Sequence, residues 1–182
     1  MSQTNQEIKR MCDKILYEYG LFDELKKIGV PHIIGSYRMD MMANNDLDID
    51  VENDKMSLEK LYKLTAFVLK TFHPVWYEAK QEVTIEGNTV WFHGFEFIIE
   101  DELFNVDVWF FNRDTISKAE DYCDKIANQS TAEQKARIIS LKQELIKRGL
   151  YRFDKYASIH VYEAVLERHI TEIEALLNYY RL

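Results

Sequence analysis

The sequence predicts an α+β protein: a mixed β-sheet flanked by helices, with a helical C-terminal part. Segments that alternate like strands fall between residues 30 and 111, whereas apolar residues recur at helical spacing near both ends of the chain. Glycine and proline are rare, 6 and 2 among 182 residues, which excludes a sandwich of many short strands. We expect a first domain over residues 1–114 and a helical part over 115–182 packed against it.

The first part of the chain predicts two helices, two strands and a third helix. Gly20 and Gly29 can end the first two helices, and Ser57 is a suitable N-cap for the third. Strict alternation of acidic and apolar residues predicts the second strand. The predicted elements are helices over 6–19 and 21–28, a strand over 32–34, a helical turn within 37–43, a strand over 46–51 and a helix over 58–72.

The second part predicts three strands followed by helices. A hairpin turn is expected at residues 86–88, and Gly94 inside a strand indicates a β-bulge. Residues 130–133 have the form of a capping box for a helix that ends near Gly149. The predicted elements are strands over 75–85, 89–99 and 104–111, helical structure from residue 115 onward, and one last helix over 159–177.

One predicted strand carries three acidic side chains on a single face. Asp46, Asp48 and Asp50 alternate with apolar residues, so their carboxylates project to one side and repel each other. A divalent cation removes this repulsion, because Mg²⁺ prefers carboxylate oxygens; a solvated outer strand is the alternative interpretation. Asp107 stands alone in an otherwise apolar strand, where a carboxylate needs a cation or another partner.

A Gly-Ser pair precedes the acidic strand. Gly35 lets the backbone approach a phosphate, and Ser36 with free N–H groups can bind anionic oxygens. Together with the strand Asp46–Asp48 and the later Asp107, this order of residues resembles the nucleotidyltransferase superfamily typified by DNA polymerase β. The resemblance covers about residues 30–112 and is closest to small antibiotic nucleotidyltransferases of the lincosamide kind.

The resemblance implies a metal-dependent reaction. Two Mg²⁺ ions, which Mn²⁺ could replace, would be held by Asp46, Asp48 and Asp107, with Asp107 on the side of the acceptor hydroxyl. Gly35 and Ser36 would bind the phosphates of an NTP, with ATP expected. The implied enzyme transfers an NMP group from the NTP to a hydroxyl acceptor.

The sequence also departs from the pattern of that superfamily. Arg38, a further candidate for nucleotide binding, lies one place earlier than the common arginine, and Asn45 replaces the common serine before the first aspartate. The third aspartate makes the frame ambiguous, because the metal pair could be Asp46 and Asp48 or Asp48 and Asp50. Counting from Arg38 favours the first pair, and Asp48 belongs to either.

Charge and cysteine content constrain the partners. The formal net charge is −8, the opposite sign from most proteins that coat duplex nucleic acid, so nucleic acid is not favoured, although a tRNA end stays open. We expect the acceptor to be a small molecule such as an antibiotic; alternatives are a protein side chain, or a non-catalytic antitoxin-like or nucleotide-binding module. No apolar stretch predicts a membrane segment, and two distant cysteines favour the cytoplasm. The oligomeric state stays open.

Several other polar and aromatic residues have an ordinary structural interpretation. Glu78, Lys80 and Glu82 alternate on a strand beside the expected acceptor; a solvated strand face explains them about as well, so they are not assigned to the site. Residues 135–155 contain seven Lys and Arg against two acidic residues; we interpret them as the solvated face of a helix, with attraction of the triphosphate or an RNA end as the alternative. The aromatic run 109–111 is expected in the core, and the five histidines lack zinc-ligand spacing.

Overall fold

The computed structural model describes residues 4–84, 87–152 and 156–180. Its centre is one five-stranded sheet in the order β1-β2-β5-β4-β3. β2 and β5 run parallel, and the other neighbouring strands are antiparallel, so the predicted mixed sheet is confirmed. The strands are β1 (Val30–Ile33), β2 (Asp46–Glu52), β3 (Trp76–Val83), β4 (Thr89–Ile99) and β5 (Glu102–Phe111).

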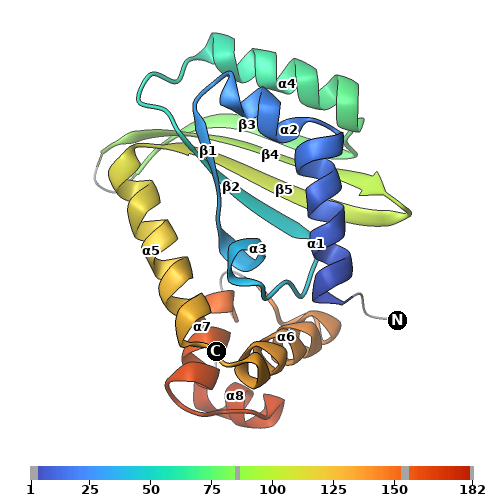
Figure 1. Ribbon diagram of the computed structural model, residues 1–182, viewed down its shortest axis with the longest axis vertical. Helices are drawn as coiled ribbons and strands as arrows, with labels where there is room; N and C mark the ends of the chain where they lie inside the picture. Colours follow the sequence, from blue (N-terminus) through green and yellow to red (C-terminus); the bar gives the residue numbers. More distant parts are fainter. Residues whose placement is uncertain (1–3, 85–86, 153–155, 181–182) are drawn as a thin grey trace.

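Helices cover one face of the sheet and extend beyond one of its ends. In Figure 1, α1, α2 and α4 lie across the sheet, while α5 runs from the end of β5 to α6, α7 and α8. The short α3 lies between β1 and β2 in the chain. The helices are α1 (Asn5–Asp13), α2 (Leu21–Lys26), α3 (Gly35–Met39), α4 (Leu58–Phe72), α5 (Arg113–Gln129), α6 (Ala132–Lys147), α7 (Ser158–Leu166) and α8 (Ile173–Tyr180), and α1 continues into the π-helix η1 (Lys14–Glu18).

The buried side chains form two clusters. One joins the sheet to the N-terminal helices and α4, and includes Leu47, Ile49 and Val51 of β2, each fully buried. The other joins α5 to α8 and also takes in Met39 and Met41 from α3 and the residues after it. The segment that follows β1 therefore contacts both clusters, which places the Gly-Ser pair at their boundary.

Three local predictions need correction, and a fourth lies partly outside the described residues. The last predicted helix is two helices, α7 and α8, separated where His169 adopts a positive φ of 54°. The capping box of α6 begins one residue later than expected, at Thr131, with Gln134 as its second member. The helical turn after β1 starts at Gly35 rather than residue 37. The hairpin turn at 86–88 falls partly on residues outside the described ranges; next to it, Thr84 N donates to Asn88 O at 2.8 Å.

No helix of the described residues is both long and apolar enough to span a bilayer.

The two-residue turn between β4 and β5 is built without glycine. Glu100 and Asp101 both have positive φ, 50° and 64°, the backbone twist that tight hairpins favour. The carboxylate of Glu100 forms ion pairs with Arg10 and Lys14, which tie this turn to α1 and η1.

Candidate active site

The acidic face of β2 meets β5 at the centre of the sheet. Alternation along β2 buries Leu47 and Ile49 against the helices and turns Asp46 and Asp48 to the other face. The parallel register pairs Asp48 with Asp107. One carboxylate oxygen from each of the three aspartates lies within 4.8 Å of the others. We call Asp46, Asp48 and Asp107 the aspartate trio.

The trio concentrates negative charge in a half-buried place. Burial raises the pKa of Asp48, and the charges of Asp46 and Asp107 raise it further. Burial also raises the pKa of Asp107 to about 6, with Asp46 contributing. Asn105 Nδ2 donates to Asp46 Oδ1 at 2.7 Å and so fixes that carboxylate. Closely spaced oxygen ligands whose ionised forms repel each other suit hard cations such as Mg²⁺.

Gly35 is required where the chain passes the trio. Its φ is +63°, and a Cβ built there would lie 2.2 Å from Asp48 Oδ2. The backbone N–H of Ile34 donates to the carbonyl oxygen of Asp48 at 3.2 Å, which holds the end of β1 beside β2. Any side chain at position 35 would displace the Asp48 carboxylate. The Gly-Ser pair and the acidic strand thus form one unit.

Lys142 is the residue of this site that sequence reasoning missed. Its side chain, from α6, is fully buried, and its Nζ donates to Ser36 Oγ at 2.8 Å. The ammonium lies 5.7 and 5.6 Å from the ring centroids of Tyr151 and Tyr162. Its charge acts to lower the pKa of Asp48, so it lies within electrostatic reach of the trio.

The expectation that the basic residues of 135–155 face solvent is therefore wrong for Lys142. A signal for it was present in the sequence. Lys142 stands four residues after Ile138, next to Leu141 and three before Leu145, which places it inside the apolar stripe of α6 rather than opposite it. A lysine at such a position is rarely buried unless it has a specific partner.

Arg38, which was predicted to bind nucleotide together with Gly35 and Ser36, contacts α5. Its Nε and Nη2 donate to the two carboxylate oxygens of Asp124 at 2.7 and 2.9 Å, and its Nη1 donates to Glu120 at 3.2 Å. These contacts hold α3 against α5. The structure brings Lys142, not Arg38, to Ser36.

Asp50 lies outside the trio. It is on the same face of β2 but only 2% exposed, and burial raises its pKa to about 7, with the charge of Glu120 contributing. The metal-type group found among the described residues consists of Asp46, Asp48 and Asp107. This arrangement favours Asp46 and Asp48 as the metal pair in the ambiguous frame.

A cavity of about 480 Å³ opens beside Asp107 on β3, β4 and β5. Gly94 lies opposite both Glu78 and Asp107 in unbroken strand pairing, so the predicted bulge is absent. The glycine serves close packing instead: a Cβ there would lie 2.5 Å from the Phe92 ring and 3.1 Å from Asp107 Oδ1. The ring of Phe92 fills the space that a side chain would take.

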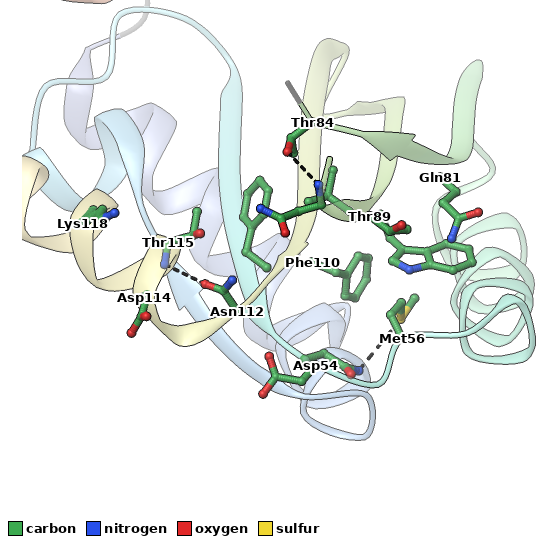
Figure 2. Close-up of a pocket in the computed structure, with 15 residues that line it drawn as sticks. Asp54, Met56, Gln81, Thr84, Thr89, Phe110, Asn112, Asp114, Thr115 and Lys118 are labelled. Carbon is green, nitrogen blue, oxygen red and sulfur yellow. Dashed lines mark hydrogen bonds between the residues drawn. The ribbon is translucent and has the colours of Figure 1, made fainter. Parts of the chain in front are cut away.

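A larger cavity of about 940 Å³ lies at the carboxyl ends of β2 and β5, away from the trio. Figure 2 shows Asp114 and Lys118 of α5 on one side of it and Gln81 on the other. Part of its polar lining is occupied by structural bonds: Asn112 Oδ1 accepts from Thr115 N at 2.9 Å, and Asn53 Nδ2 donates to Ile28 O at 2.7 Å. None of the trio lines this cavity, so size alone does not identify the active site.

Comparison with solved structures identifies the fold. The Cid1 poly(U) polymerase, bound to Mg and 3′-dATP, matches with a TM-score of 0.61 and 17% identity over 91% of this chain and 50% of that one. The polymerase core of TRAMP, an RNA surveillance complex, matches with 0.59 and 19% over 91% and 50%. A cytoplasmic RNA terminal U-transferase matches with 0.54 and 16% over 88% and 53%.

The chain thus spans about half the length of these structures. No model of a protein family matches the sequence, and no curated protein does either. These similarities show the fold alone: the five-stranded mixed sheet and its flanking helices are shared with the polymerase and transferase structures that the chain matches.

Proposed function

We propose that the protein is a metal-dependent nucleotidyltransferase that moves an NMP group from an NTP, with ATP expected, to a hydroxyl acceptor. The observation that carries this proposal is the convergence of the trio oxygens within 4.8 Å beside Gly35 and Ser36. The proposal also requires a fold on which nucleotidyl transfer can occur, and the solved structures that share this fold include polymerases.

The donor set fits divalent metal. Asp46, Asp48 and Asp107 would hold Mg²⁺, in two ions or with Mn²⁺ as a substitute, because these hard cations take carboxylate oxygens. Bound ions would neutralise the trio and polarise the phosphate and acceptor oxygens. Burial and mutual repulsion raise the pKa of Asp48, so the metal-free protein holds these carboxylates at a cost that cation binding removes.

The nucleotide phosphates would bind on the side of Ser36 and Lys142. The buried ammonium of Lys142 needs compensating negative charge, and its own charge acts to lower the pKa of the nearby Asp48, which burial raises. Phosphate oxygens would supply that negative charge once metal neutralises the aspartates. Ser36 Oγ, held by Lys142, would orient a phosphate oxygen, and the rings of Tyr151 and Tyr162 keep water from the ammonium.

Transfer is an in-line substitution at the α-phosphorus. The acceptor oxygen forms a bond to phosphorus while the bond to the bridging oxygen breaks, and pyrophosphate leaves with that electron pair. A carboxylate oxygen of Asp107, on the acceptor side, would accept the hydroxyl proton. Asp46 and Asp48 would remain metal ligands throughout.

We further propose a small-molecule acceptor such as an antibiotic, a catalytic domain over 1–114 and a cytoplasmic location. The domain boundary rests on the two buried clusters. The location rests on Cys12 and Cys123, both free and buried, as thiols persist in a reducing compartment.

The test uses calorimetric titration with ATP and with GTP, in the presence of Mg²⁺ and again with chelator. We expect binding only with metal, because the phosphates and the trio otherwise repel each other. Labelled NTPs and a panel of hydroxyl acceptors then report transfer. Equal nucleotide binding with chelator would reject the metal bridge, and metal-dependent binding without transfer to any acceptor class would favour a nucleotide-binding module.

A further inference from the structure

The face of the sheet beside Asp107 carries a cavity of mixed aromatic and acidic character. The described residues that line it are Trp76, Glu78, Lys80, Phe92, Glu96, Asn105, Asp107 and Trp109, and we call it the acceptor-side cavity. It extends from Asp107 across β4 to β3, whereas Ser36 and Lys142 lie on α3 and α6. A molecule in this cavity would therefore approach the trio from a different side than the phosphates of the proposed NTP.

Aromatic rings supply flat surface in this cavity. Trp109 and Phe92 pack with ring centroids 4.6 Å apart, and Trp109 also stacks on Phe111 at 5.6 Å with an interplanar angle of 7°. Trp76 is 44% exposed at the far end. The predicted core role of the run 109–111 holds for Phe110, which is 2% exposed, while Trp109 lies on the opposite face with Asp107.

The charge of the cavity is negative. Three carboxylates line it, Glu78, Glu96 and Asp107, against one ammonium, Lys80. Lys80 Nζ is already shared between Glu78 at 3.2 Å and Glu82 at 2.7 Å, so it neutralises little else. Glu96 forms no ion pair with any other described residue, and its charge contributes to the raised pKa of Asp107. With Asp107 committed to metal, Glu96 remains to receive a cation.

We propose that the acceptor is a cationic small molecule: a hydroxyl compound with a flat apolar ring or ring face and a protonated amine. The ring would lie on Trp109 and Trp76, and the ammonium would lie near Glu96 and Glu78, where aromatic faces and carboxylates both favour positive charge. This inference rests on the proposed function, since it assigns the second substrate of the same reaction.

An RNA strand is the competing occupant, because the similar solved structures include enzymes that act on RNA. Bases could stack on the same rings. The phosphates that follow them need a positively charged groove, and the cation among the described lining residues is Lys80, held by two glutamates. The charge complementarity of the cavity therefore favours an amine over a polyanion.

Binding of simple probes tests the chemistry without knowledge of the natural acceptor. The probes are 2-phenylethylamine, its neutral counterpart 2-phenylethanol, its anionic counterpart 3-phenylpropionate, and a short oligoadenylate. Each is titrated by ligand-observed NMR into wild type, Glu96→Gln, Glu78→Gln and the control Glu59→Gln, with Mg²⁺ and a non-hydrolysable ATP analogue present. Glu59 lies on α4, on the helix-covered side of the sheet, and its side chain is 77% exposed.

We expect the amine to bind tightest and the Glu96→Gln change to weaken it about twofold to fivefold, the range of one partly exposed charge pair. Glu78→Gln should weaken it less, since Lys80 partly neutralises Glu78. Neither change should affect the alcohol, and Glu59→Gln should affect no probe. Tighter binding of 3-phenylpropionate or of oligoadenylate than of the amine would overturn the proposal, as would unchanged amine affinity in Glu96→Gln.

Failure of the proposed function gives a different result. In that case the ATP analogue does not bind with Mg²⁺ in the same samples, whereas the preference of the cavity for the amine can still be measured in protein without nucleotide. A transfer assay completes the test: hydroxylated amines should accept label from an NTP, and their N-acetylated forms should do so at least several-fold less efficiently.

Discussion

The two sides of the aspartate trio differ in charge and in construction. On one side, a fully buried lysine holds Ser36 beside Asp48. On the other, Glu78 and Glu96 line an open cavity with the exposed ring of Trp76 and the half-buried ring of Trp109. A single group of carboxylates thus separates a place suited to an anion from a place suited to a cation. In the proposed reaction, the residues around the trio, rather than the trio itself, would therefore set the charge of the two substrates.

Their construction differs just as much. The Ser36 side combines α3 and α6, whose contacting residues are 106 positions apart in the chain and belong to different structural parts. The acceptor-side cavity is built from three consecutive strands joined by hairpins. The first side therefore depends on how the helical C-terminal part packs, and the second does not. Variants on either side should therefore separate the proposed binding of nucleotide from the proposed binding of the acceptor.

The largest effect is expected at the shared centre. Asp48→Asn should lower transfer by at least about a hundredfold, because even outer-sphere changes at metal sites cost tenfold to a hundredfold. The same change should stabilise the metal-free protein by about 1 kcal/mol, or roughly 2–4 °C in melting temperature, by removing one like charge. Wild type should gain about 2.7 kcal/mol from metal and NTP at a hundred times their dissociation constant.

Activity assays and melting curves with chelator and with Mg²⁺ plus NTP check this, and Asp50→Asn is the matched control. It should keep substantial activity, since Asp50 lies outside the trio. Asp48 would not belong to the metal group if Asp48→Asn lowered the melting temperature of the metal-free protein. The same would follow if metal and NTP stabilised Asp48→Asn as much as they stabilise wild type. An inactive Asp50→Asn with an active Asp46→Asn would shift the metal pair by two residues.

An intermediate effect is expected at Lys142. Lys142→Met keeps the volume of the buried chain but removes its charge, and should weaken binding of metal and NTP about tenfold to a hundredfold, the usual value of a hydrogen bond to a charged group. Binding of the amine probe on the other side should not change. Calorimetry measures the first and NMR titration the second. Lys147→Met, exposed at the end of the same helix, serves as control; equal losses in both variants would contradict a specific role for Lys142.

The smallest effect on the site is expected from the core beneath the acceptor side. His93 of β4 is fully buried, its Nε2 lies 3.1 Å from Thr65 Oγ1 of α4, and burial lowers its pKa to about 4. Between about pH 6.5 and pH 4 the unfolded chain takes up a proton at this residue while the folded chain does not. The free energy of unfolding therefore decreases as pH falls through this range, by on the order of 2–3 kcal/mol for this shift.

Denaturant unfolding of wild type and His93→Gln at a series of pH values tests the effect. The variant should lose less stability between about pH 7 and pH 4, and its binding of NTP and of the amine probe at neutral pH should stay within about twofold of wild type. Parallel pH curves for the two proteins would show that His93 titrates normally in the folded state.

The central strands were the most predictable part of the molecule. The alternation of Asp46 to Val51 determines both the strand and its two faces, and Asp107 is marked by its apolar neighbours. β2 and β5 pair although they lie far apart in the sequence. That pairing could be predicted only through the resemblance to known transferases. The register that places Asp48 opposite Asp107 comes from the structure.

The errors share a physical cause, which is tertiary context. Gly94 was assigned to a bulge because local rules do not show that the Phe92 ring fills its place. Lys142 was assigned to solvent because its partner Ser36 is far away in the sequence. The last helix divides because six residues between Leu166 and Ile173 turn the chain, although the apolar stripe continues across the turn. The domain boundary near residue 114 stays a prediction, supported by the two buried clusters.

The parallel pairing of β2 and β5 also bears on how the chain is made. Asp46 and its hydrogen-bonding partner Asn105 are 59 residues apart, and β5 lies between β2 and β4 in the sheet. During synthesis the first strands must therefore wait until β5 has left the ribosome before the sheet can close. Such non-local pairing slows folding and prolongs the exposure of apolar strands. We expect nascent chains that stop before residue 111 to need chaperone protection, and the contact between Ser36 and Lys142 to form only after α6 has followed.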